Sequence, residues 1–79
     1  MRLERIQDFL RSHNMHFTYR QERDCGAIDF IHRGLSYHVW EYPAPERGAC
    51  SNVRTCGRQE DFEDDYESAI LEILESWFV

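Results

Sequence analysis

Residues 34–42, GLSYHVWEY, decide the fold of this chain. The stretch holds three aromatic residues and a valine, and these are the side chains that a half-buried sheet surface accepts best. Gly34 opens it and Pro43-Ala44-Pro45 closes it, so both ends of a strand are marked. Because the two ends of the chain carry patterns typical of helices, we expect this strand to lie in the middle of a sheet.

The two-residue period of a strand divides this stretch into two faces. One face carries Leu35, Tyr37, Val39 and Glu41, and the other carries Ser36, His38, Trp40 and Tyr42. Only one of these faces can join a core built by the rest of so short a chain.

Outward from this strand, residues 2–13 and 65–78 show the apolar spacing of three and four that predicts amphipathic helices. Asp64 or Asp65 is expected to cap the second helix. Three further strands are expected, at residues 15–22, 27–32 and 49–57, because apolar and polar residues alternate there. The apolar stripes of the two helices are formed by Leu3, Ile6, Phe9 and Leu10, and by Tyr66, Ala69, Ile70, Ile73, Leu74 and Trp77.

The predicted order is α-β-β-β-β-α, which indicates an α+β fold. A single four-stranded antiparallel sheet with the N- and C-terminal helices on one face is the compact arrangement for this order. The expected core on the sheet is Phe17, Tyr19, Ile28, Phe30, Tyr37, Val39 and Val53. No segment remains to cover the opposite face of the sheet.

Length and composition favour a single domain spanning residues 1–79, close to the lower size limit for a self-sufficient core. The hydrophobic content of 42% is typical of a globular chain. No apolar run is long enough to cross a bilayer and no export signal is visible, so a cytoplasmic protein without a membrane partner is expected. Cys25, Cys50 and Cys56 form an odd set without metal-ligand spacing and favour reduced thiols.

The net charge of −6 comes from residues 60–67, EDFEDDYE, because the rest of the chain has nine acids and nine arginines. Acids before a helix are favoured by its dipole, so a solvated helix start is one interpretation. A surface for a basic partner is the other. The cluster comprises Glu60, Asp61, Glu63, Asp64, Asp65 and Glu67.

The uncovered sheet face is the predicted binding site. Trp, Tyr and Arg are enriched where protein interfaces concentrate their binding energy. Trp40 and Tyr42 are the expected anchors, and a protein partner or a homodimer is the expected occupant. The alternative is a small anionic ligand or nucleotide, with its ring on Trp40 and its phosphate on Arg54 or Arg58. The candidate binding residues are Trp40, Tyr42, His38, Arg54, Arg20 and Asn52.

The sequence favours neither a metal site nor an enzyme. His13 and His16 straddle a helix–strand junction, and the other histidines and cysteines lack a ligand spacing. No phosphate-binding loop or nucleophile motif is present, so neither a cofactor nor catalysis is expected. A pair such as Cys50 with His38 remains the only catalytic alternative.

The stretches YHVWEY and SNVRTCGRQEDFEDDYESAILEIL resemble short, uncharacterised bacterial proteins of similar length. Some of those are prophage-associated, and some carry a "kinase" label that the residues here do not match. The resemblance implies no activity, although a mobile-element origin would suit an acidic inhibitor of a nucleic-acid-targeting system. The element order also resembles the double-stranded-RNA-binding domain. That domain has basic residues where this chain has residues 60–67, so direct nucleic-acid binding is not expected.

Overall fold

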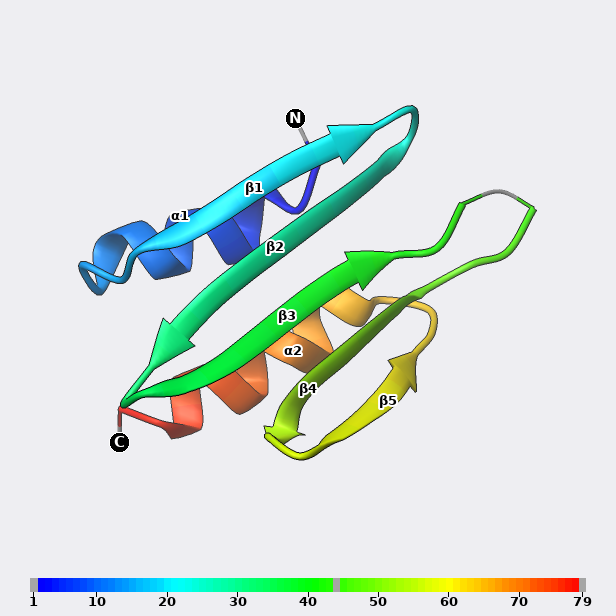
Figure 1. Cartoon of the computed structure of the whole chain (residues 1–79). Helices are drawn as coiled ribbons and strands as arrows, with labels where there is room; N and C mark the ends of the chain where they lie inside the picture. The colour runs from blue at the N-terminus through cyan, green and yellow to red at the C-terminus, as the bar shows by residue number, and fades with distance from the viewer. Residues whose placement is uncertain (1, 44, 79) are drawn as a thin grey trace.

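The computed structural model describes residues 2–43 and 45–78. Met1, Ala44 and Val79 lie outside the described residues, and Ala44 is the middle residue of the Pro-Ala-Pro segment that was expected to close the central strand. The fold is α+β: one antiparallel sheet in the order β1-β2-β3-β4-β5, with both helices behind it in Figure 1. β3 is the central strand, as the sequence predicted. The elements are α1 (Glu4–Ser12), β1 (Phe17–Glu22), β2 (Cys25–His32), β3 (Leu35–Glu41), β4 (Ala49–Thr55), β5 (Arg58–Phe62) and α2 (Tyr66–Ser76).

The prediction of four strands is wrong, because residues 58–62 add a fifth. This segment carries two acids and an arginine, and its β-propensity is low. The hairpin with β4 nevertheless places Phe62 opposite Ala49, and both side chains are buried in the core. Burial of Phe62 therefore decides the local structure against propensity.

Tight turns set the register of the first three strands. Arg33 and Gly34 both have positive φ, 52° and 80°, as a two-residue hairpin turn requires. This turn pairs Phe30 with Tyr37 and Ile28 with Val39, which places these four side chains on the helix-bearing face. A slip of one residue would move all of them to the other face.

The core lies between this face and the two helices. Ile6, Leu10, Ile28, Val39, Ile70 and Leu74 are fully buried, and Phe17, Tyr19 and Tyr37 pack partly buried around them. The predicted core is thus confirmed. Ala49 and Phe62 are core residues that the sequence did not reveal.

Glu41 is a buried carboxylate that ties four parts of the chain together on the helix-bearing side. It accepts hydrogen bonds from Arg2 Nε at 2.6 Å, from the Gly26 N–H at 2.7 Å and from the Tyr66 hydroxyl. Burial opposes ionisation, but these donors outweigh it and hold the pKa of Glu41 below its usual value. Burial, together with the bond to Glu41, raises the pKa of Tyr66 to about 12.

The start of α2 is capped by Asp65, one of the two residues predicted for this role. Its carboxylate accepts from the Ser68 N–H at 3.3 Å and from the Ser68 hydroxyl at 2.6 Å. We expect Asp65→Ala to lower the free energy of unfolding by about 1 kcal/mol, measured by urea denaturation, and Asp65→Asn to have little effect because asparagine caps equally well. Equal losses in the two variants would contradict the capping role.

Candidate binding face

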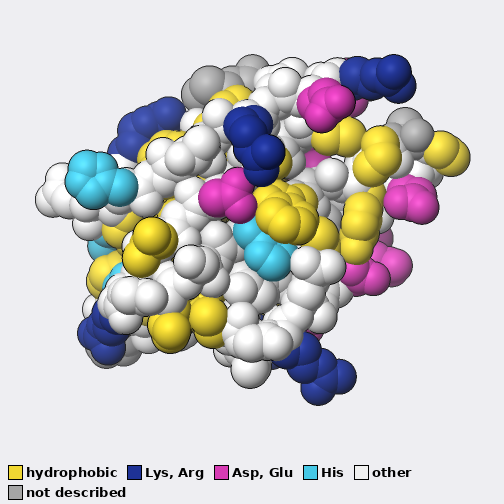
Figure 2. Space-filling model, in the orientation of Figure 1, with side chains coloured by type: hydrophobic (Ala, Val, Ile, Leu, Met, Phe, Trp, Pro, Cys, Tyr) yellow, Lys and Arg dark blue, Asp and Glu magenta, His cyan; other side chains and the backbone are white. Residues whose placement is uncertain are grey.

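The face of the sheet turned away from the helices is not covered by any described element, and we call it the open face. Figure 2 views it directly, with a hydrophobic group near the centre and charged side chains around it. Strand pairing and alternation assign its members. They are Thr18, Arg20, Glu22, Cys25, Ala27, Asp29, Ile31, Ser36, His38, Trp40, Cys50, Gln59 and Asp61.

A row of directly paired residues crosses the middle of the open face. Strand by strand from β1 to β5 it reads Arg20, Ala27, Trp40, Cys50, Asp61. Arg20 therefore lies at one edge of the sheet and Asp61 at the other, and the Trp40 indole lies between two small side chains. We call this set the central row.

Trp40 is held in one orientation although 39% of its surface is exposed. Its indole N–H donates to Asp29 Oδ1 at 3.1 Å, and its ring stacks on His38 with centroids 4.1 Å apart. Asp29 in turn accepts from Arg20 Nη2 at 2.9 Å. A side chain fixed before binding loses less entropy when a partner arrives, so this arrangement is pre-organised for contact.

Tyr42 and Cys50 continue the apolar surface beside Trp40. The Tyr42 hydroxyl donates to Asp61, and this bond raises the pKa of Tyr42. Cys50 is a free thiol with only 4% of its surface exposed, and burial raises its pKa. Since the thiolate is the reactive form, Cys50 is poorly suited to nucleophilic chemistry.

The prediction that Asn52 is exposed on the open face is wrong, because its side chain is buried within the sheet. Its side chain accepts from the His38 N–H at 2.9 Å and donates to the carbonyls of Ser36 and Cys56 at 3.0 and 2.9 Å. Only 8% of Asn52 is exposed. The amide thus replaces backbone pairing where β3 and β4 separate, which is a structural role.

Arg54 lies on the helix-bearing side, and the prediction that it projects from the open face is wrong. The reason is a register shift between Ser51 and Thr55 that breaks the alternation of β4. The guanidinium bonds Glu60 at 2.6 Å and stands over the Phe62 ring, and both of these face the helices. Alternation along β5 puts Arg58 on the same side as Glu60. Trp40 and Arg54 are therefore not assembled into one site.

The predicted acid cluster is likewise distributed over several surfaces. Asp61 ends the central row, Glu60 faces the helices, and Asp65 caps α2. Glu67 lies across the helical layer, where it accepts from the backbone N–H of Arg5 at 3.1 Å. Most acids of the chain lie on helices or loops. On the open face Asp29 bonds Arg20, Glu22 lies on the same strand as Arg20, and Asp61 lies at the opposite edge, so this face is mildly acidic.

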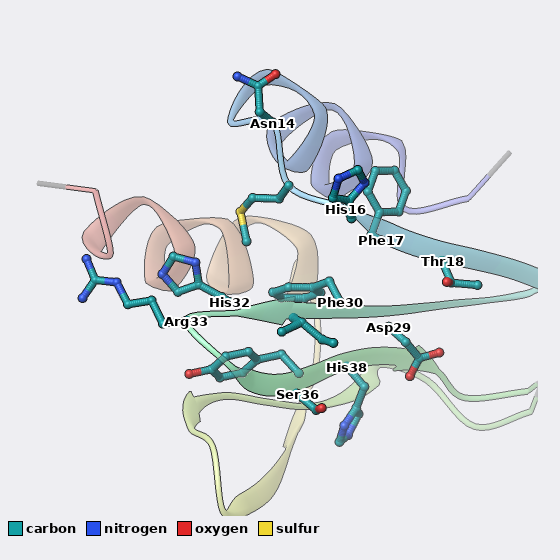
Figure 3. Close-up of a pocket in the computed structure, with 13 residues that line it drawn as sticks. Asn14, His16, Phe17, Thr18, Asp29, Phe30, His32, Arg33, Ser36 and His38 are labelled. Carbon is teal, nitrogen blue, oxygen red and sulfur yellow. The ribbon is translucent and has the colours of Figure 1, made fainter.

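A hollow of about 770 Å³ adjoins the open face at the end where β1 begins and β2 ends. Figure 3 shows its lining, with His38, Ser36 and Asp29 pointing away from the helices. Ile31, which is 64% exposed, also contributes to it. Trp40 lines none of the five best-defined hollows in the described part of the chain.

Among residues 2–43 and 45–78, no group of three or more His, Cys, Asp or Glu side chains is placed to hold a metal ion. No helix in these ranges is long and apolar enough to cross a membrane. Comparison with protein-family models, curated proteins and solved structures gives no match for this chain.

Of the predicted binding residues, Trp40, His38, Arg20 and Tyr42 are brought together, whereas Asn52 and Arg54 are not. Sequence reasoning missed Asp29 as the residue that orients Trp40, and Gln59, whose Oε1 lies 2.7 Å from His38 Nε2. Asp29 and Trp40 lie on one face of the sheet by alternation along their strands, but their contact depends on the cross-strand pairing of β2 with β3. Gln59 gave no signal because β5 itself was not predicted.

Proposed function

We propose that this protein is a non-enzymatic binding module that contacts another protein surface through its open face. The observation that supports this best is the pre-organised state of the partly exposed Trp40, fixed by Asp29 and His38. Tryptophan is prominent among residues that carry interface binding energy, and rigid anchors lose little entropy on association.

The charge distribution supports the same proposal. The exposed surfaces of α1 and α2 carry Glu4, Asp8, Glu72 and Glu75, which keep that layer polar and hydrated. The open face has a rim of mixed charge, with Arg20 and the carboxylates of Glu22, Asp29 and Asp61, around an aromatic centre. An apolar centre with a polar rim is the usual organisation of a protein interface.

The nucleotide alternative loses its geometric basis, because the base-stacking residue and the proposed phosphate ligands Arg54 and Arg58 occupy opposite sides of the sheet. The acidic inhibitor remains compatible with a protein partner, since an inhibitor would also act through a surface. Its acids would have to come from the loop between β5 and α2 rather than from one continuous cluster.

Substitution of the anchor tests the proposal. We expect Trp40→Ala to remain folded, because the side chain stands outside the main core, and to weaken binding by a factor of about 30 or more, equivalent to roughly 2 kcal/mol at a binding hot spot. Circular dichroism checks the fold, and sedimentation together with capture from a lysate of the source cells checks binding.

Leu35→Ala is the matched control, because Leu35 is an exposed apolar residue on the same strand but on the other face. It should leave binding unchanged. If Trp40→Ala binds as well as the wild type, or if both variants lose binding equally, the open face is not the binding surface. If Trp40→Ala unfolds, Trp40 acts as a core residue and the proposal fails.

A further inference from the structure

We propose that the open face is occupied by a second copy of this chain, packed face to face about a twofold axis that runs along β3. This inference rests on the proposed function and names its partner. It follows from how the central row is distributed over the five strands and from the shape around Trp40.

The strand order is symmetric about β3, with two strands on each side. A twofold axis parallel to β3, above the open face, brings β3 of both copies together and places β1 of one copy over β5 of the other. Such an interface uses the same patch on both subunits, so each contact occurs twice. Aligned packing of two sheets at a separation of about 10 Å is a common arrangement.

The charges of the central row are complementary under this symmetry. Arg20 on β1 would face Asp61 of the partner subunit on β5, and the reverse pair would form at the other edge. Within one chain these residues are separated by four strand spacings, about 19 Å, so they have no direct contact. Within one chain, Arg20 donates to Asp29 through Nη2, and Asp61 accepts from the Tyr42 hydroxyl through Oδ1.

The centre of the row is also self-complementary in shape. Trp40 projects between Ala27 and Cys50, which are too small to reach the height of the indole. The two Trp40 rings of a dimer can therefore pack side by side over these small residues, in the offset geometry that aromatic rings prefer.

The size of the face sets the expected affinity. Five strands are about 24 Å wide and six residues about 20 Å long, so two copies would bury on the order of 1,000 Å² in total. This area is at the lower limit for specific interfaces, and we expect a dimer with a Kd in the micromolar range.

A charge-exchange experiment tests this pairing by sedimentation equilibrium. We expect Arg20→Glu and Asp61→Arg each to weaken dimerisation at least about tenfold, because each places like charges opposite one another twice. An equimolar mixture of the two variants should restore the wild-type affinity. In the mixed dimer both edge contacts again join opposite charges, and no intramolecular contact can produce this rescue.

Arg54→Glu makes the same charge change on the helix-bearing side, and it should leave the dimer unaffected. The inference is overturned if the wild-type chain stays monomeric at millimolar concentration, or if the mixture associates no better than the separate variants. If the chain is monomeric but captures a different protein in a Trp40-dependent way, that protein and not a second copy occupies the open face. The dimer inference then fails and the proposed function stands. If Trp40→Ala changes neither association nor capture, both fail.

Discussion

Replacement of Glu41 by glutamine is expected to lower the free energy of unfolding by about 2–3 kcal/mol, the usual effect of losing hydrogen bonds to a buried charged group. The carboxylate has 4% of its side chain exposed and accepts from Arg2, Gly26 and Tyr66. A glutamine keeps one acceptor oxygen but carries an N–H₂ group in place of the other, so Arg2 loses the negative charge and one of its two acceptor atoms. Urea denaturation at neutral pH measures the loss.

The same residue makes stability depend on pH in a defined window. Because the pKa of Glu41 is lower in the folded chain than its usual 4.5, its stabilisation is complete above that value and is lost as the pH falls through it toward the folded pKa. Glu41→Gln should remove this part of the acid sensitivity. Glu60→Gln, a partly exposed control, should change stability by no more than about 0.5 kcal/mol. A wild-type pH profile unchanged by Glu41→Gln would contradict the role of the carboxylate.

Gly48→Ala is the second substitution with a large expected effect, a loss of about 2 kcal/mol or more in the free energy of unfolding. Gly48 has a φ of +96°, and a Cβ there would overlap with the carbonyl oxygen of Phe62. The strand pair β4–β5 would have to separate at the point where Phe62 enters the core. Thermal and urea denaturation check the result.

Gly34→Ala is the control that separates backbone strain from steric overlap. Gly34 also has a positive φ, +80°, but a Cβ at this turn meets no atom within 4 Å. Its cost should be about 1 kcal/mol, from the left-handed conformation alone. If the two variants lose the same free energy of unfolding, steric overlap with Phe62 does not explain the effect of Gly48→Ala.

The sequence alone determined both helices, the first four strands and the residues that form most of the core. These features depend on local periodicity and turn chemistry, which lie within a few residues of one another. The division of GLSYHVWEY into a buried and an exposed face follows from the same period. It placed Tyr37 and Val39 in the core and Trp40 on the open face.

Tertiary structure decided the rest, because the deciding contacts join residues far apart in the chain. Burial of Phe62 against Ala49 makes residues 58–62 a strand despite their charge. The register shift in β4 turns Arg54 to the helices, and the gap between β3 and β4 draws Asn52 into the sheet. The orientation of Trp40 depends on Asp29 of the neighbouring strand. A two-residue period predicts which side chains share a face only while the pairing is regular, and cross-strand partners are fixed only when the sheet has formed.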